Sequence, residues 1–380
     1  MSQHQHHSQK SLTRRDFLRL TGLAAAGVLL GSCAPKAAEE TAVVAEATSP
    51  AAVAPTVSEF PRVAIGQAKE YTLDVIREEV AKLIDLLGGL GDVVKSGDSV
   101  AIKTNLTGGV KSAPVPGYTA IESFVTHPLV VQALIEQVQT AGAKEVFVVE
   151  SVYEWASYSQ WGYEEIAEAT GAKLIDLNQT DPFDKYDEAP VGEGSFVYPS
   201  FIVNKLIRDV EVFMSVSKMK NHYNCGVTHT MKNLMGMIPA VFYTLSPEHN
   251  WRSEVHGVEG QTPTRLPRAL IDLNRARPIH FGLIDGIMTA EAGEGPWIST
   301  MKPVQPGLLF AGKNMVSTDA VATAAMGYDP TTDYPNAPFI RGDNHLKIAS
   351  ELGMGPISLD KIEVVGAAIE DVVYPFTPAW

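Results

Sequence analysis

The chain has 380 residues, of which 45% are hydrophobic and 19% are charged, the balance of an ordinary globular protein. Its formal net charge of −14 argues against a nucleic-acid partner, because an acidic surface repels phosphate backbones. The two cysteines, Cys33 and Cys225, are too few for a four-cysteine zinc site or for an iron–sulfur cluster carried by this chain alone.

The N-terminus has the pattern of an export signal. Thr13–Arg19 matches the twin-arginine motif, and the apolar run Leu20–Leu30 follows it. Leu30–Cys33 resembles the lipobox of bacterial lipoproteins, with Cys33 as the lipidated first residue of the mature protein. An apolar run of about 11 residues is too short to cross a bilayer, which disfavours a transmembrane anchor. We therefore expect a signal peptide over residues 1–32 and a lipid anchor at the outer face of the cytoplasmic membrane.

The next segment differs in composition from the rest of the chain. Residues 33–60 are dominated by Ala, Pro, Glu, Thr and Val, and residues 34–58 contain no aromatic side chain. This composition is typical of a flexible tether. A single α/β domain is expected over residues 61–380.

Within this domain, short apolar runs alternate with amphipathic segments. The apolar runs predict strands at residues 63–65, 99–103, 146–150, 173–176, 211–217, 279–285, 308–311 and 361–365. The amphipathic segments predict helices at residues 72–87, 128–141, 163–170, 266–274, 319–326 and 344–352, with Thr126 as the cap of the second. Alternation of this kind predicts a mainly parallel β-sheet flanked by helices on both faces, with strand 211–217 near its centre.

The stretch Ser217–Gly236 is unusually polar for its position between an apolar strand and a Met-rich segment. If the backbone stays extended after the strand, Lys218, Lys220 and His222 point to one side. Gly226 then interrupts the chain, and Thr228 is suited to cap a helix that runs towards Gly236. On such a helix three side chains share a face, namely His229, Lys232 and Asn233.

Polar residues also follow the apolar core of four predicted strands. These residues are Lys103–Asn105, Glu150–Ser151, Lys218 with Lys220, and Asp285–Gly286. Ligands of open parallel sheets bind outside the carboxyl ends of the strands. The agreement between the four strands therefore predicts one shared crevice, with the Gly-rich acidic loop Glu291–Pro296 at its rim.

Several segments together resemble a known protein family. They are KMKNH…GVTHTMKNLMG, IKTNL, THPLVVQALIEQVQTAGAKEVFVVES, IDGIMTAEAGEGP and STDAVATAAMGYDP. The combination resembles the bacterial and archaeal family known as domain of unknown function 362 (DUF362), over about Val63 to Gly366. The resemblance implies the extent of the domain and the positions of its motifs. It implies no reaction, because the family has no assigned activity, and the ferredoxin-like cysteine clusters of some members are missing from this chain.

The candidate site residues follow from these patterns. The residues predicted to act in catalysis are Lys218, Lys220, His222, His229, Lys232 and Asp285. The residues predicted to bind substrate are Lys103, Asn105, Asn233, Glu291 and Glu294. A divalent metal held by His222, His229 and Asp285 is one alternative, since imidazole and carboxylate suit such ions. Cys225 lies near lysines, which lower a thiol pKa, although a packed and inert cysteine is the simpler interpretation.

Two classes of function fit this set of residues. The first is an exported, lipid-anchored enzyme that acts on a small anionic substrate bearing a carboxylate or phosphate, with lysines as charge clamp and His or a carboxylate as acid or base. The alternative is a non-catalytic, lipid-tethered binding or assembly protein. The clustering of titratable groups favours the enzyme, whereas a binding protein would more often have an aromatic-lined pocket. The partners expected are a small anionic ligand and the membrane.

Overall fold

The computed structural model describes residues 60–258 and 260–380, which belong to one compact unit. The expected signal peptide, the lipidation site Cys33 and nearly all of the expected tether lie outside the described residues. Within the described part of the chain, no helix combines the length and the apolar character that a membrane crossing requires.

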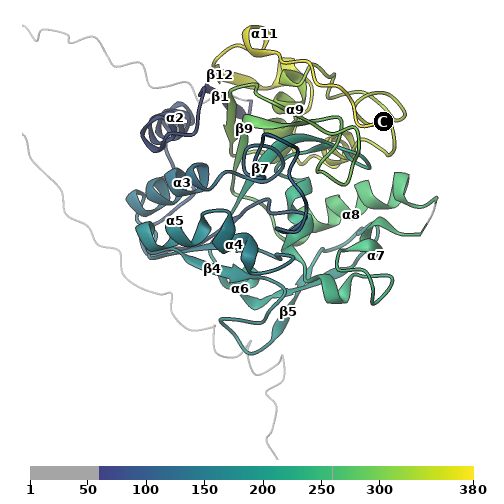
Figure 1. The fold of residues 1–380 in the computed structure, drawn as a ribbon, viewed down its shortest axis with the longest axis horizontal. Coiled ribbons are helices and arrows are strands. Elements are labelled where there is room, and N and C mark those ends of the chain that lie inside the picture. Colours follow the sequence, from purple (N-terminus) through teal and green to yellow (C-terminus); the bar gives the residue numbers. More distant parts are fainter. Residues whose placement is uncertain (1–59, 259) are drawn as a thin grey trace, which may run out of the picture. The chain divides into compact units, whose positions relative to one another are not determined.

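A mixed, mainly parallel sheet organises the described residues (Figure 1). Its eight-strand path is β12-β1-β11-β9-β7-β2-β3-β4, and β8 and β10 pair with β7 and β9 at its margin. The bounds in chain order are β1 Arg62–Gln67, β2 Ser99–Lys103, β3 Glu145–Glu150, β4 Lys173–Asp176, β7 Val212–His222, β8 Gly226–Thr228, β9 Phe281–Glu291, β10 Lys302–Val304, β11 Leu308–Gly312 and β12 Glu363–Gly366. Only β11, β8 and β10 run antiparallel to their neighbours.

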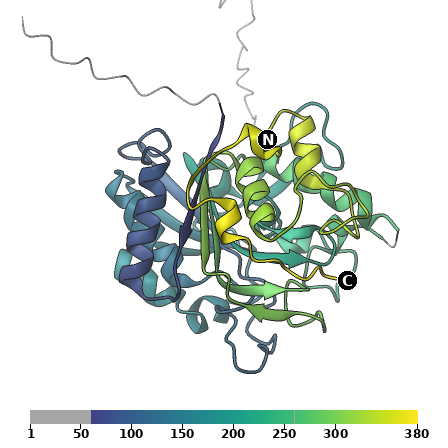
Figure 2. The same ribbon diagram turned by 90° about the horizontal axis from the view of Figure 1, so that it is seen from above.

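Helices cover both faces of this sheet. One face carries α2 Leu73–Leu86, α3 Pro128–Thr140 and α5 Tyr163–Thr170, and the other carries α8 Thr262–Ala276, α9 Met315–Ala325 and α10 His345–Glu351. Figure 2 views the sheet between the dark-blue α2 and the green and yellow helices of the C-terminal half. Side chains of one strand alternate between two hydrophobic cores, since Ala101 packs in one and Val100 and Ile102 pack in the other. The predicted fold class is confirmed.

The central strand is β7, whose eleven residues are all buried. It pairs in parallel with β9 on one side and β2 on the other. It runs five residues beyond the predicted end at Ser217, because Lys218, Lys220 and His222 are buried and paired there and are not solvated. β9 likewise continues past Asp285 to Glu291, so the Gly-rich loop starts later than the apolar run suggested.

The predicted helix from Thr228 to Gly236 does not form. Thr228 pairs with Lys220 in the hairpin β7–β8, and a short 3₁₀ helix, η1 Lys232–Met237, follows. Gly226 makes the hairpin turn at φ +77°, where an added Cβ would meet the Phe339 ring at 2.7 Å. The cap of α3 is also one residue later than predicted, because the His127 side chain accepts a hydrogen bond from the Leu129 amide.

Smaller elements without a clear periodic signal complete the fold. A separate hairpin consists of β5 Tyr186–Pro190 and β6 Ser200–Asn204. The short helices are α4 Ala156–Gln160, α6 Lys205–Asp209, α7 Ser253–His256 and α11 Ile369–Val372, with the 3₁₀ turns η2 Ala240–Phe242 and η3 Leu359–Lys361. Of these, α7 matters for function, because it borders the cavity described below.

Candidate active site

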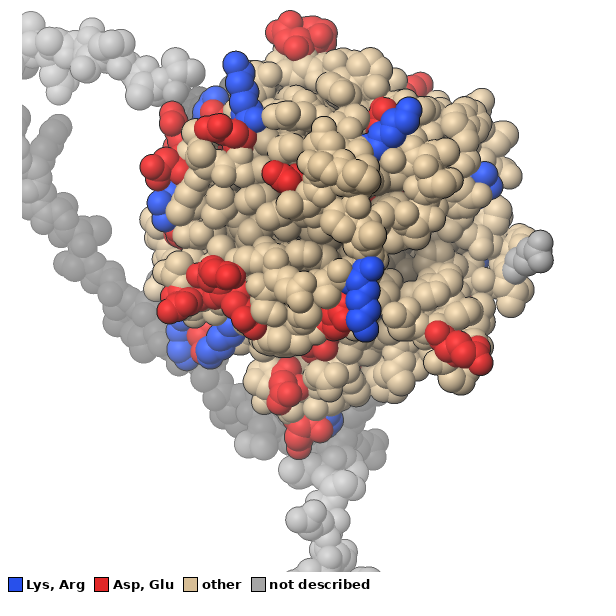
Figure 3. Space-filling model, viewed as in Figure 1, with Lys and Arg blue, Asp and Glu red and all other residues tan. Residues whose placement is uncertain are grey.

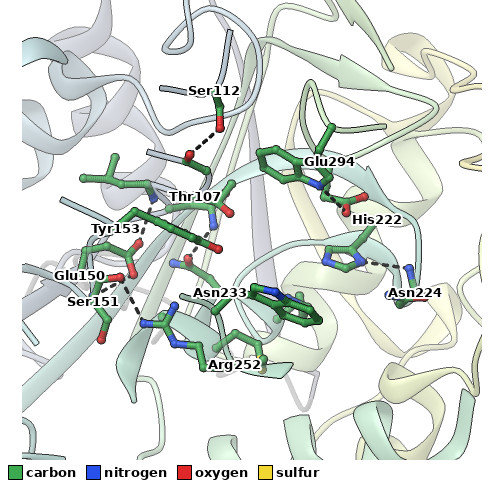
Figure 4. A pocket seen from close by; sticks show the side chains of 18 of the residues that line it. Thr107, Ser112, Glu150, Ser151, Tyr153, His222, Asn224, Asn233, Arg252 and Glu294 are labelled. Atoms are coloured by element: carbon green, nitrogen blue, oxygen red, sulfur yellow. Dashed lines mark hydrogen bonds between the residues drawn. The ribbon is translucent and has the colours of Figure 1, made fainter. Parts of the chain in front are cut away.

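A cavity of about 520 Å³ lies at the edge of the sheet where β2, β3 and β7 end (Figure 4). These neighbouring strands are parallel, so their carboxyl ends meet there as the sequence predicted. Of the predicted site residues, the cavity is lined by Lys103, Asn105, His222, Lys232, Asn233 and Glu294. It is not lined by Lys218, Lys220, His229, Asp285 or Glu291.

A buried ion pair forms one wall of the cavity. The Lys103 amino group lies 2.8 Å from a carboxylate oxygen of Glu150, and both side chains are at least 95% buried. It also donates to the Thr104 carbonyl at 2.7 Å. Burial lowers the pKa of Lys103 to about 8, although Glu150 opposes that shift. A lysine in this state exchanges its proton close to neutral pH.

The close approach of this pair depends on a glycine in η1. A Cβ added at Gly236 would lie 1.9 Å from Glu150 Oε1 and 2.5 Å from Lys103 Nζ. Gly236 therefore leaves the space that the pair occupies. Glu150 is held further by the amides of Leu106 and Ser151, which donate to its two oxygens at 2.9 and 3.1 Å.

Asn233 connects the strand ends beneath the cavity. Its amide nitrogen donates to the Lys103 carbonyl at 3.2 Å and to Ser215 Oγ at 3.0 Å. Its amide oxygen accepts from Asn105 Nδ2 at 3.2 Å. Asn233 thus fixes η1 against β2 and β7, and it is a positioning residue for the Lys103–Glu150 wall.

Lys232 and Arg252 are the two cavity cations that form no salt bridge within the part of the chain that the structure describes. Their exposed fractions are only 8% and 7%. Arg252 donates to two backbone carbonyls, those of Ile238 at 2.9 Å and Ser151 at 3.2 Å. Within residues 60–258 and 260–380, the Lys232 amino group makes no hydrogen bond or ion pair, and Glu294 acts on it only at longer range. Burial lowers the pKa of both groups, so a negative charge placed in the cavity would stabilise their charged forms.

His222 lines the cavity as a neutral imidazole. Burial lowers its pKa well below the ordinary value, and neighbouring Lys232 adds to the effect. Its Nδ1 accepts a hydrogen bond from the Asn224 amide at 3.1 Å, so we assign the proton to Nε2. In this tautomer His222 offers a ligand a hydrogen-bond donor and has no free lone pair for a metal.

The acidic loop contributes Glu294 and Trp297 to the opposite wall. Glu294 accepts from the Tyr223 amide at 2.9 Å and from Trp297 Nε1 at 3.1 Å, so it ties the loop to the turn of the hairpin β7–β8. In Figure 4, Glu294 and His222 lie across the cavity from Glu150, Ser151 and Arg252. Glu291 is turned elsewhere and accepts from the Thr377 amide at 2.7 Å.

Lys218 and Asp285 form a second, closed network next to the cavity. Their charged groups are 2.9 Å apart and both side chains are fully buried. Lys218 also donates to Tyr71 Oη and to the Ile121 carbonyl, both at 2.9 Å. Asp285 accepts from Tyr71 Oη at 2.6 Å and from the His127 amide at 3.0 Å. Asp285 therefore binds no imidazole ring of the predicted site, in contrast to the role predicted for it.

Lys220 and His229 are buried outside the cavity. Lys220 donates to the Phe124 carbonyl, and burial lowers its pKa to about 7. In the described residues neither ring nitrogen of His229 meets hydrogen-bond geometry, although the Asp319 backbone lies close enough to favour the charged ring. Burial outweighs this and lowers the pKa of His229 to about 3. His229 is thus not placed to touch a ligand in the cavity.

The predicted metal ligands are not brought together. His222 lines the cavity, Asp285 pairs with Lys218, and His229 lies in the core. Among the described residues, no group of three or more His, Cys, Asp or Glu side chains has a geometry that could hold a metal ion. Cys225 is buried, and burial raises its pKa to about 12, so it is not activated as a thiolate.

Some cavity residues escaped the sequence analysis. They are Tyr153, Tyr223, Trp251, Arg252, His256 and Trp297, together with Glu150, which was noted only as a strand end. Arg252 and His256 belong to a polar segment without hydrophobic periodicity, yet Arg252 is buried and burial lowers the pKa of His256 to about 4. One local signal for these residues was the position of Trp251 next to Arg252 in the sequence, since aromatic and arginine residues are typical of recognition surfaces.

Comparison with known proteins identifies a matching family and proteins of more distant similarity. The family model described as Domain of unknown function (DUF362) matches residues 100–324. The thylakoid-associated protein of Synechocystis sp. is 28% identical over 270 residues, which are 71% of this chain and 76% of that protein.

Two solved structures are weakly similar. A protein from Thermotoga maritima has 11% identity and a TM-score of 0.34, over 66% of this chain and 57% of that one. The lactate racemase apoprotein from Thermoanaerobacterium thermosaccharolyticum has 13% identity and a TM-score of 0.38, over 67% and 54%. The chain thus spans little more than half of either structure, and TM-scores this low establish no shared activity.

Proposed function

Because the chain belongs to the DUF362 family, whose description names no activity, we propose a function from the cavity itself. The protein binds a small anionic molecule, bearing a carboxylate or a phosphate, and acts on it as an enzyme. The observation that carries this proposal is that two buried cations, Lys232 and Arg252, line one cavity and form no salt bridge with a carboxylate of the described residues. Burying unpaired charges is costly, and an anionic ligand offsets that cost.

The residues that line the cavity have different roles in this proposal. Lys232 and Arg252 hold the anion, and a charge-assisted hydrogen bond in a partly dry cavity is about twice as strong as a neutral one. His222 donates from Nε2. The Lys103–Glu150 pair is the candidate proton carrier, because Lys103 has a pKa of about 8 and lines the same cavity. A ligand seated on the two cations reaches this pair from the cavity side.

A second candidate is a binding protein that holds the ligand without converting it. The observation in its favour is the aromatic lining, which consists of Tyr153, Tyr223, Trp251 and Trp297. Stacking surfaces of this kind are typical of recognition sites. The two candidates differ in the Lys103–Glu150 pair. The double variant Lys103→Met with Glu150→Gln, which removes both charges of the buried pair, should abolish turnover in an enzyme, while in a binding protein it should leave ligand affinity almost unchanged.

We call Lys232 and Arg252 together the charge clamp, and their proposed role makes a direct prediction. Lys232→Met and Arg252→Met should each weaken the binding of small carboxylates and phosphates about 10-fold to 100-fold, because each removes a charge-assisted hydrogen bond of about 1.5–3 kcal/mol. Without ligand, Lys232→Met should be as stable as the wild type or more stable, because it removes a buried charge that makes no salt bridge in the described residues. Arg252→Met should lose some stability, because the carbonyls of Ile238 and Ser151 lose their donor. The measurements are the thermal shift with each ligand and the melting temperature without ligand. Lys302→Met, at an exposed lysine outside the cavity, is the matched control. Unchanged affinity in both clamp variants would contradict the proposal.

We also propose that the protein is exported by the twin-arginine route and anchored through lipid on Cys33. The support is the sequence alone, in the order Thr13–Arg19, Leu20–Leu30 and Leu30–Cys33. Replacing Arg14 and Arg15 by Lys should keep the precursor in the cytoplasm, and Cys33→Ala should prevent lipid-dependent processing. Cell fractionation and metabolic labelling with a fatty acid measure the two steps. If both variants gave mature, membrane-bound protein, the proposed export route and lipid anchor would be contradicted.

Nucleic acid remains outside the proposed partners. On the face shown in Figure 3, Lys and Arg side chains stand singly among Asp and Glu and form no continuous basic patch. The net charge of −14 supports the same proposal, because binding to a phosphate backbone rests largely on clustered positive charge. Three buried cations, Lys103, Lys232 and Arg252, instead line the cavity, which at about 520 Å³ has the size of a small-molecule site.

A further inference from the structure

The cavity combines two kinds of wall. Lys232 and Arg252 supply buried positive charge on one part of the lining, and four aromatic side chains supply ring surface on other parts of it. A small anion such as acetate or inorganic phosphate would contact only the charged part. At about 520 Å³ the cavity is within the range of sites for drug-sized ligands, so there is room for a further ligand group against the rings.

Trp297 is held in place although it is not part of the core. Its side chain is 45% exposed, yet Nε1 donates to Glu294 at 3.1 Å. The indole packs directly on the backbone of Gly108, in the loop after β2, where an added Cβ would lie 2.4 Å from Cζ3. A half-exposed indole with a fixed orientation offers a preformed stacking surface, which costs little conformational entropy when a ligand binds.

Tyr223 and Trp251 are restrained in similar ways. The Arg341 guanidinium lies 3.9 Å from the centre of the Tyr223 ring, and the Tyr223 amide is bound by Glu294. Trp251 is 37% exposed and contacts the ring of His256 at a centroid distance of 5.0 Å. Each of these rings lines the cavity. The charged end of the cavity is therefore bordered by several oriented aromatic surfaces from three different segments.

We propose that the ligand of this cavity is a small molecule in which a carboxylate or phosphate is joined to an aromatic or heteroaromatic ring. The proposal rests on the proposed function, since it assigns the anionic group to Lys232 and Arg252. It adds that the ring stacks on the aromatic wall, with Trp297 as its main platform. Aromatic rings prefer offset-stacked or edge-to-face contacts with one another, and this preference separates a ring from an aliphatic group of equal size.

The test compares matched anions by isothermal titration calorimetry on the folded domain with its native cavity. The probes are inorganic phosphate, phenyl phosphate and cyclohexyl phosphate, with acetate, benzoate and cyclohexanecarboxylate as the carboxylate series. We expect phenyl phosphate or benzoate to bind at least about 10-fold more tightly than its ring-free counterpart, and more tightly than its cyclohexyl counterpart. The better of the two series also identifies which anionic group the site takes.

Variants separate the two parts of the site. Trp297→Leu should remove most of the advantage of the aromatic ligand and leave the affinity for the ring-free anion unchanged. Lys232→Met should weaken both. Trp380→Leu, at an exposed tryptophan outside the cavity, should change neither.

Three results would overturn the inference. Equal affinity for ring-free and aromatic anions, both lost in Lys232→Met, would refute the aromatic ligand and leave the anion site intact. Equal affinity for cyclohexyl and phenyl ligands would show that the wall selects apolar bulk only. The absence of binding by every anion of both series would refute this inference and the proposed function together.

Discussion

Replacing Asp285 by alanine is expected to lower the free energy of unfolding by about 3–5 kcal/mol, because it leaves the Lys218 ammonium buried without its counter-charge. The two groups are 2.9 Å apart and both side chains are fully buried. Asp285 also binds Tyr71 Oη and the His127 amide, which would lose their partner in the variant. Chemical denaturation of the wild type and the variant measures the change.

Two comparisons make this result specific to a buried pair. The double variant Lys218→Met with Asp285→Leu should recover part of the lost stability, because it removes both charges and refills the space with apolar atoms. Glu145→Ala, which breaks the exposed pair with Lys173, should have little measurable effect. If Asp285→Ala instead keeps its stability and loses ligand binding, the Lys218–Asp285 pair belongs to the binding site, as the sequence had suggested.

Acidification is expected to destabilise the protein well above the pH at which most carboxylates are protonated. Burial lowers the pKa of His229 and His345 to about 3, and that of His127 and His256 to about 4. An unfolded histidine titrates near pH 6.5, so between about pH 6.5 and pH 4 the unfolded state binds more protons than the folded state. Stability must then fall as pH falls, by up to about 1.4 kcal/mol per pH unit for each such histidine.

Two buried carboxylates act in the opposite direction, Asp319 and Asp176, because burial raises the pKa of both. Burial raises the pKa of Asp319 to about 7, so its folded form binds a proton between about pH 7 and pH 4 and offsets one of the four histidines. The net slope remains positive. The measurement is the free energy of unfolding in urea at pH 7, 6 and 5.

A pair of core variants isolates the cause. His229→Leu with His345→Phe should flatten this pH dependence, and it should raise stability at pH 5, because burial disfavours the charged form of both imidazoles and the variant removes both. Phe339→Leu changes a ring that contacts His345 at a centroid distance of 5.9 Å but carries no proton. It should lower stability equally at each pH. A free energy of unfolding that is constant from pH 7 to pH 5 in the wild type would contradict this account.

The fold was accessible from sequence wherever hydrophobic periodicity decides the structure. The run 212–216 lacks any polar alternation, which predicts a strand buried on both faces, and β7 is such a strand. The same reasoning ended that strand too early. Lys218 and Lys220 continue it because they reach the carbonyls of Ile121 and Phe124, and no local pattern shows these distant partners.

The error at Thr228 to Gly236 has a similar origin. Spacings of three and four residues fit a helix. The backbone amide of Asn233 does donate a hydrogen bond to the His229 carbonyl, as it would in a helix. The preceding residues, however, pair with β7 as strand β8, so only the short turn η1 remains helical. Tertiary pairing outweighed local propensity here.

The sequence predicted the position of the candidate site better than it predicted which residues line it. Parallel strands gather their ends at one edge, which located the cavity and correctly associated Lys103 with Asn233. Charge type alone could not tell Lys232, which forms no salt bridge in the described residues, from Lys218, which pairs with Asp285. Arg252 comes from a loop that no periodicity places, and its burial appears only when that loop folds over the strand ends.

The most direct test of the charge clamp, Lys232 and Arg252, is a crystal of the protein soaked in selenate. Selenate is an anion that mimics phosphate and scatters anomalously. The account predicts a selenium peak in the cavity within hydrogen-bond reach of the Lys232 and Arg252 side chains, and no such peak in Lys232→Met. A peak that persists in the variant, or a wild-type cavity without selenate while exposed lysines bind it, would contradict the account.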